Sequence, residues 1–140
     1  MNTHWLIVLF SFVFFNQNCF AQQTEVLFEN EDAVITSTVI DCIDEANGTA
    51  KQYVSLAATN KRAYSIEISF KKDLWYGAKC ISCNSTSQEY VSVIQFEGNE
   101  VEAGQCGDSK KLLLFKKMLK LKDVRELSHF ELKNLNTRKL

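Results

Sequence analysis

A stretch with strict alternation of apolar and polar side chains constrains the fold of this chain more than any other feature. Between residues 64 and 71, aromatic and aliphatic residues occupy every second position, and serine, glutamate or lysine occupies the others. Successive side chains of a β-strand point to opposite faces of its sheet, so this period of two predicts a strand with one buried face. The residues of the expected buried face are Tyr64, Ile66, Ile68 and Phe70.

Other segments of this kind recur at intervals of about ten residues, as in antiparallel sandwiches. Residues 110–121 fit an amphipathic helix or a strand, and we favour a strand with Leu113 and Phe115 on one face because the neighbouring segments are strands. With seven or eight strands, the chain is expected to be all-β, an antiparallel immunoglobulin-like β-sandwich. The other expected strands are residues 25–28, 34–41, 51–59, 89–96 and 129–135, and a short one near Trp75.

The first 21 residues have the pattern of a secretory signal peptide. They contain no Lys, Arg, Asp or Glu, and residues 5–15 are apolar apart from Ser11. This run of about 11 residues is shorter than the roughly 20 that cross a bilayer as a helix. Small residues at Cys19 and Ala21 match a signal-peptidase site. We therefore expect a signal peptide at residues 1–21 and one periplasmic or secreted domain at residues 22–140, with an uncleaved anchor as the alternative.

Four cysteines follow the expected cleavage site: Cys42, Cys80, Cys83 and Cys106. An even number in an exported chain predicts two structural disulfides, but the sequence leaves their pairing open. Joining the first to the second and the third to the fourth would close loops of about 39 and 24 residues. Joining Cys80 to Cys83 would instead leave a small ring beside a long loop. A Cys-x-x-Cys pair also occurs in redox centres and zinc sites, so extracytoplasmic thiol-disulfide or metal handling is the alternative function.

Charge is distributed unevenly along the chain, although the net charge is only −1. Residues 22–109 contain 6 basic and 14 acidic residues, a net charge of −8, and residues 110–140 contain 10 and 3, a net charge of +7. The chain has 3 arginines against 13 lysines, and no aromatic residues interleave the C-terminal lysines as they would in a nucleic-acid groove. We expect a solvated basic face and no nucleic-acid partner.

Motifs for catalysis are absent from the sequence, which contains no Gly-x-Ser-x-Gly, phosphate-binding loop or His-Glu-x-x-His. His129, the one histidine after residue 21, lies in a strand-like segment where a structural or surface role is more common than general-base catalysis. The acidic residues 41–48 supply hard oxygen ligands of the kind calcium accepts, but their spacing favours a plain acidic turn. We expect no catalytic residue, metal or cofactor, and hence no enzyme.

Two adjacent aromatic residues, Trp75 and Tyr76, are the remaining candidates for ligand contact. Together they could form a platform for stacking on a sugar or binding a protein. The alternative is that Trp75 packs against a disulfide inside the sandwich.

A resemblance adds to this interpretation. The spacing of the cysteines and several aromatic residues resembles that of small uncharacterised exported cysteine-containing proteins of Bacteroidota, over most of the mature chain. The resemblance implies an extracytoplasmic location and a similar style of fold, with no known activity. We therefore expect an exported, non-enzymatic binding or envelope-associated module with a protein or glycan partner. The residues that carry the resemblance are Cys42, Trp75, Tyr76, Gly77, Cys80, Cys83, Glu89, Tyr90, Gly104, Cys106, Leu114, Phe115, Phe130, Glu131, Leu132 and Asn134.

Overall fold

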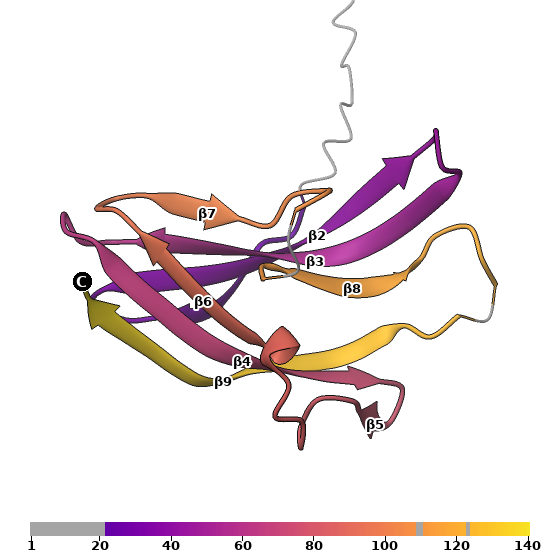
Figure 1. The fold of residues 1–140 in the computed structure, drawn as a ribbon. Coiled ribbons are helices and arrows are strands. Elements are labelled where there is room, and N and C mark those ends of the chain that lie inside the picture. Colours follow the sequence, from indigo (N-terminus) through magenta and orange to yellow (C-terminus); the bar gives the residue numbers. More distant parts are fainter. Residues whose placement is uncertain (1–21, 109–110, 123) are drawn as a thin grey trace, which may run out of the picture.

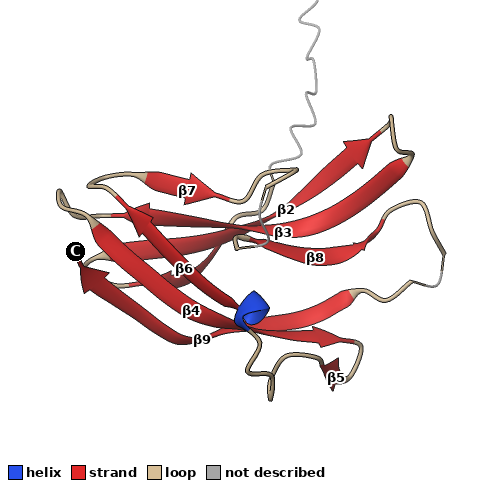
Figure 2. Ribbon diagram, viewed as in Figure 1, coloured by secondary structure: helices blue, strands red, loops and turns tan. Residues whose placement is uncertain are grey.

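The structure, a computed structural model, describes residues 22–108, 111–122 and 124–140, so the expected signal peptide lies outside the described chain. These residues form an all-β protein, as the sequence predicts, with nine strands and one 3-10 turn (Figures 1 and 2). None of them forms a helix long and apolar enough to cross a membrane. The elements are β1 (Glu25–Glu29), β2 (Ala33–Asp44), β3 (Thr49–Asn60), β4 (Ile66–Tyr76), β5 (Lys79–Cys80), the turn η1 (Gln88–Tyr90), β6 (Val91–Phe96), β7 (Val101–Ala103), β8 (Leu113–Met118) and β9 (Leu127–Lys139).

Five strands form the first sheet, sheet A, and every pairing in it is antiparallel. β1, β2 and β3 follow one another as hairpins, and β2 pairs with β3 along its whole length, from Ala33 opposite Asn60 to Asp44 opposite Thr49. The loop between β2 and β3 ends in Gly48, whose φ of 63° lies in the left-handed region that glycine adopts without strain. On its other side, β3 pairs with β8 near its start and with β7 near its end.

β4 is the centre of the second sheet, sheet B, which is also antiparallel throughout. β9 pairs with one side of β4 along the whole strand. The other side pairs with β6 from Ile66 to Lys71 and with β5 at Trp75 and Tyr76. The expected short strand near Trp75 is therefore the end of β4. The sequence pattern does not reveal β5 and β7, because strands of two and three residues are too short to show alternation.

The two sheets form two layers around one hydrophobic core (Figure 1). The alternation that predicts a strand at residues 64–71 is confirmed, because Ile66, Ile68 and Phe70 are each at most 1% exposed. Tyr64 lies just before β4 and is 38% exposed, so it is not part of the buried face. The immunoglobulin-like arrangement stays a prediction. The other core residues are Ala33, Ile35, Val54, Leu56, Ala58, Leu74, Ile94, Phe96, Leu112, Leu114 and Leu127.

The sequence of residues 110–121 fits both a helix and a strand. The structure has strand β8 within this segment, so the prediction of a strand is confirmed. Leu112 and Leu114 enter the core, whereas Phe115 turns towards Tyr53 of β3. The rings of Phe115 and Tyr53 meet edge to face, with centroids 5.8 Å apart. The pairing with β3 is regular from Leu113 to Phe115, so these two side chains share one face, as expected. A bulge in the pairing of β3 with β8 follows Phe115.

Gly104 allows β7 and β8 to share one side of β3. Its N–H donates to the carbonyl of Leu56 at 3.0 Å, and the N–H of Leu56 donates to the carbonyl of Leu112 at 2.9 Å. The segments that lead out of β7 and into β8 therefore meet at one residue of β3. A Cβ atom on Gly104 would lie 2.4 Å from the carbonyl oxygen of Leu112, closer than non-bonded atoms approach.

Replacing Gly104 with alanine is expected to destabilise the fold. The main chain at residue 104 or 112 would have to move, which costs roughly 1–3 kcal/mol as in other overpacked sites. Urea unfolding followed by tryptophan fluorescence measures the change. Glu102→Ala, at an exposed position in β7, is the matched control. Equal unfolding midpoints for the two variants would contradict the role given to Gly104.

Candidate functional site

A cleft of about 320 Å³ opens between β3 and β8 of sheet A and β4 and η1 of sheet B. It combines one buried lysine with several aromatic side chains, and we call it the Lys72 cleft. Three leucines, Leu74, Leu113 and Leu114, form its apolar part. The other lining residues are Lys51, Tyr53, Lys72, Tyr76, Glu89, Tyr90 and Phe115.

Lys72 lies in the inward row of β4, between Phe70 and Leu74, and is only 3% exposed. Its ammonium group donates a long hydrogen bond of 3.5 Å to the carbonyl of Lys111, which also accepts from the Ser92 hydroxyl at 2.6 Å. Burial lowers the pKa of Lys72, and the negative charge of Glu89 opposes that shift in part. Lys72 is therefore protonated less readily than a surface lysine.

Tyrosines from three elements form much of the wall of the cleft. The hydroxyl of Tyr76 donates to the carbonyl of Phe115 at 2.5 Å, which joins the end of β4 to β8 across the two sheets. Burial raises the pKa of Tyr76. The pKa of Tyr90 is also raised, first by burial and then by the negative charge of Glu89. Both phenols therefore remain protonated at neutral pH and can donate and accept hydrogen bonds.

The two residues expected to form a ligand platform, Trp75 and Tyr76, point to opposite faces of sheet B because they are neighbours in β4. Tyr76 points inward and packs against the core, whereas Trp75 lies on the outer face, with its ring centroid 4.9 Å from that of His129. The structure therefore does not bring the pair together, and only Tyr76 lines the Lys72 cleft. Trp75 is half-buried and is not part of the core cluster, and its packing against a disulfide stays a prediction.

His129 is a surface residue in the structure. Its side chain is 58% exposed, and its Nε2 lies 3.0 Å from the Oε1 of Glu131. Lys133 contacts the same carboxylate, and these two neighbours, Lys133 more strongly, lower the pKa of Glu131. This exposed chain of ion pairs is typical of the solvated face of an edge strand.

The two expected disulfides are present, and the structure pairs Cys42 with Cys106 and Cys80 with Cys83. Their Cα–Cα distances, 5.5 and 5.7 Å, lie within the usual range for disulfides. Cys42–Cys106 joins the end of β2 to the segment after β7, across 64 positions of sequence. This is the arrangement of one small ring beside one long loop.

The Cys80–Cys83 ring holds Ser82 against the side of β4. Ser82 is fully buried, and its hydroxyl accepts from the N–H of Leu74 at 2.8 Å and donates to the carbonyl of Lys72 at 2.9 Å. These main-chain groups lie between the part of β4 that pairs with β6 and the part that pairs with β5. The N–H of Ile81 also donates to the carbonyl of Leu74 at 2.9 Å. The ring thus supplies bonds that a neighbouring strand would make, which indicates a structural role.

The acidic loop after β2 forms its own hydrogen bonds. Asn47 donates to the carboxylate of Asp44 from its side chain at 2.7 Å and from its main chain at 3.1 Å, and these bonds lower the pKa of Asp44. Asp41 accepts from the side chain of Gln52 at 2.8 Å. This is the geometry of an acidic turn. Within the described residues, no three His, Cys, Asp or Glu side chains are grouped so that they could hold a metal ion.

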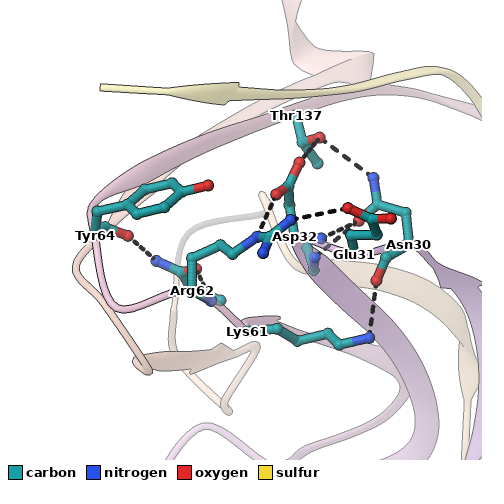
Figure 3. Close-up of polar contacts among 9 residues, drawn as sticks. Asn30, Glu31, Asp32, Lys61, Arg62, Tyr64 and Thr137 are labelled. Atoms are coloured by element: carbon teal, nitrogen blue, oxygen red, sulfur yellow. Dashed lines mark hydrogen bonds and ion pairs between the residues drawn. The ribbon is translucent and has the colours of Figure 1, made fainter.

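A second polar cluster, the Arg62 corner, consists of Asn30, Asp32, Arg62 and Thr137 (Figure 3). Arg62 Nε donates to one oxygen of Asp32 at 2.7 Å, and the hydroxyl of Thr137 donates to the other at 3.2 Å. The side-chain amide of Asn30 donates to Thr137 at 3.3 Å. The hydrogen bond from Arg62 lowers the pKa of Asp32. Because these groups bond to one another, the corner fastens two turns of the chain to the end of β9 and has a structural role.

Two wider depressions, of about 750 and 730 Å³, lie between β6 and β7 and between β1 and β9. Every ionisable side chain that lines them is exposed or half-exposed. The Lys72 cleft differs because a buried lysine is among its lining residues. This combination makes it the best candidate for a ligand site in the described chain.

Lys72 is not among the residues expected from the sequence to bind a ligand, although the pattern that places it inward is present. The alternation of residues 64–71, continued past its last member, places Lys72, Leu74 and Tyr76 on the same inward side as Phe70. A lysine in such a row indicates a buried charge. This alternation does not predict that Tyr53 and Tyr90 line the cleft, because the packing of the two sheets brings them there.

Comparison with known proteins identifies no relative: no protein-family model, no curated protein and no solved structure matches the chain. The geometry of the cleft and the two disulfides therefore provides the basis for a functional proposal.

The two disulfides are expected to contribute unequally to stability. In the chain-entropy model, Cys42–Cys106 contributes about 4 kcal/mol because it closes a long loop, and Cys80–Cys83 contributes about 2 kcal/mol. Urea unfolding of the two double variants, Cys42→Ala with Cys106→Ala and Cys80→Ala with Cys83→Ala, measures both values. The expected result is a larger loss for the first variant. A larger loss for the second would mean that the contacts of Ser82 outweigh loop closure.

The Arg62 corner is expected to make stability sensitive to acid. The pKa of Asp32 is lower in the folded chain than in the unfolded chain, so its stabilising effect is present above the unfolded value of about 4 and disappears as the pH falls through the folded value. Asp32→Asn should therefore flatten the decrease in unfolding midpoint at acidic pH. The control is Glu31→Gln, because Glu31 also bonds to Arg62 but has a side chain that is 91% exposed. Identical acid profiles for wild type and Asp32→Asn would contradict this role.

Proposed function

We propose that the chain is an exported, non-enzymatic binding module that recognises a protein or an envelope glycan through the Lys72 cleft. The cleft is the observation that carries this proposal. Ligand sites are concave and mostly apolar, with a few polar groups that fix orientation, and their volumes begin near 300 Å³. The Lys72 cleft has this composition, because leucine and aromatic side chains line it together with a buried lysine.

An extracytoplasmic location is supported by the two disulfides, which persist in oxidising compartments. The apolar N-terminal segment with small residues at Cys19 and Ala21 supports export by the signal-peptide route. We therefore expect the partner to be part of the cell envelope.

The alternative function is thiol-disulfide or metal handling by Cys80 and Cys83. Reactive pairs usually have their first cysteine at a helix N-terminus, where the thiolate is stabilised. Here the ring lies in a turn after β5 and holds Ser82 in its contacts with β4. These contacts favour the structural role and hence the binding module.

The first test is the intact mass of the protein exported by its native host, before and after reduction. Two disulfides and cleavage after Ala21 predict a chain that begins at Gln22 and is about 4 Da lighter than its reduced form, because each disulfide removes two hydrogens. Free thiols or bound zinc would contradict the binding proposal and favour the alternative function.

The second test locates binding in the cleft. Wild type, Tyr90→Ala and Tyr64→Ala are applied to arrays of envelope polysaccharides and peptides. Tyr90 lines the cleft, whereas Tyr64 is a partly exposed tyrosine that does not line it. We expect a ligand that binds wild type and Tyr64→Ala but binds Tyr90→Ala at least about tenfold more weakly, as for the loss of an aromatic contact at an interface. Equal binding by all three, or no bound ligand, would contradict the proposal.

A further inference from the structure

The outer edge of β6 presents main-chain hydrogen-bonding groups that no neighbouring strand occupies. β6 is an outer strand of sheet B and pairs only with β4 (Figure 1). On the side of β4 that carries β6 and β5, Ser82 bonds to the main chain of Lys72 and Leu74. Hydrogen-bonding groups alternate between the two sides of a strand, so the even-numbered residues of β4 point towards β6. Their partners, the even-numbered residues of β6, therefore make the bonds between the two strands.

The odd-numbered residues of β6 direct their N–H and C=O groups away from β4. At the start of the strand, the N–H of Val91 bonds back to η1. At the end, the N–H of Glu97 donates to the side chain of Glu100 at 2.8 Å, and its carbonyl accepts from the N–H of Glu100 at 3.2 Å. Between these ends, the main-chain groups of Val93 and Gln95 have no bonding partner in the part of the chain that the structure describes.

The other outer strands have the features that normally prevent pairing with a further chain. β1 has glutamates at both ends and an interruption in its pairing. β8 and β9 have interrupted pairing and basic residues, and β5 and β7 consist of only two and three residues. By contrast, β6 has six residues, no charged residue and no proline, and its pairing with β4 is regular. An edge of this kind can accept an additional strand.

A strand added to β6 would lie over the depression of about 750 Å³ between β6 and β7. Residues opposite each other in a sheet point to the same face, so every second side chain of the added strand would enter this depression. Its lining includes Val101, which is 58% exposed, and Ala103. Val93, which is 42% exposed, would lie beside the side chains on the other face. These contacts favour apolar side chains in the added strand.

The charges around the depression favour a basic segment. Glu102 and Asp108 line it together with one lysine, Lys111. Glu97 and Glu100, in the turn between β6 and β7, are exposed and bring the net formal charge of these five residues to −3. An antiparallel strand would begin near this turn, because β6 ends there. Its lysine or arginine residues are therefore expected near its N-terminus, where they face the glutamates.

We propose that β6 docks an extended, basic segment of a partner protein as an additional antiparallel strand of sheet B. The main chain of the segment bonds to Val93 and Gln95, and its alternate apolar side chains enter the depression. A second copy of this chain is a less suitable occupant, because it would bring the same negative charge to the contact. The depression shares no lining residue with the Lys72 cleft, so this inference goes beyond the proposed function and is tested separately from it.

Amide hydrogen exchange of the mature protein tests whether the edge is free. Without a ligand, the amides of Val93 and Gln95 should exchange at least about tenfold faster than those of Ser92 and Ile94, because only the latter two bond to β4. Equally slow exchange in the monomer would overturn the inference. Slow exchange that appears only as dimers form at higher protein concentration would identify a second copy as the occupant, and would also overturn it.

Peptides with two N-terminal lysines followed by alternating apolar residues and threonines are the probes, with valine, isoleucine, leucine or phenylalanine as the apolar residue. We expect at least one of them to slow exchange at Val93 and Gln95 and to shift their amide signals saturably. N-methylation of every second peptide residue should weaken binding at least about tenfold in one of its two phases and less than about threefold in the other, because only one edge of the peptide faces β6. Glutamates in place of the lysines should weaken binding at least about threefold at low ionic strength.

Variants of β6 place the contact on the protein. Val93→Pro removes an N–H that faces away from β4, a position where edge strands tolerate proline, and should lower the affinity at least about tenfold. Val93→Ala keeps this N–H and is the matched control, with an expected change of about threefold or less. Tyr90→Ala, in the Lys72 cleft, should bind the peptide as wild type does. Circular dichroism checks that the variants fold, and the N-methylated peptides provide the same test should Val93→Pro not fold.

Four further results would overturn the inference. The first is that no peptide of the series changes the amides of β6. The second is that both N-methylated forms bind as tightly as their parent, which would exclude main-chain pairing. The third is that the acidic peptide binds as tightly as the basic one. The fourth is that a folded Val93→Pro variant binds as wild type does.

Discussion

The inward row of β4 is the constraint on which both the core and the cleft depend. A strand presents every second side chain to the same face, so residues that follow Phe70 in this row must also lie between the sheets. In the first half of β4 the row is apolar, and Ile66 and Ile68 are buried there in the core between the sheets. In the second half the same row contains Lys72 and Tyr76, where the sheets leave a cleft between them. One periodicity thus produces a packed core at one end and a polar site at the other.

The second half of β4 also shows how a strand can be completed without a neighbouring strand. β6 stops pairing at Lys71 and β5 begins at Trp75, so the main chain between them needs other partners. Ser82 supplies them from inside the Cys80–Cys83 ring. The ring therefore supports the strand segment that carries Lys72. A Cys-x-x-Cys pair can therefore have a structural role, the support of a neighbouring strand, instead of a redox role.

Much of the fold could be predicted from the sequence. Alternation and turn residues are patterns within short segments, and an even number of cysteines can be counted directly. The strand with Ile66, Ile68 and Phe70 on one face is the clearest case. The disulfide pairing could not be chosen, because the Cys42–Cys106 contact depends on how sheet A is assembled. Trp75 and Tyr76, expected to form one platform, lie on opposite faces of sheet B, since adjacent strand residues diverge. The cleft depends on Tyr53 and Tyr90, which only tertiary structure brings together.

The order of the cysteines along the chain has a consequence for folding during secretion. If the chain is exported with its N-terminus first, Cys42 emerges before Cys80 and Cys83, and Cys106 emerges last. An oxidase that joined cysteines in order of appearance would link Cys42 to Cys80, which is not the native pair. To reach the native pairs directly, Cys42 must remain unpaired until Cys106 has emerged; otherwise a mispaired intermediate must be reshuffled by thiol exchange. In an exported chain, the native pairing would thus depend on the timing of oxidation in the receiving compartment.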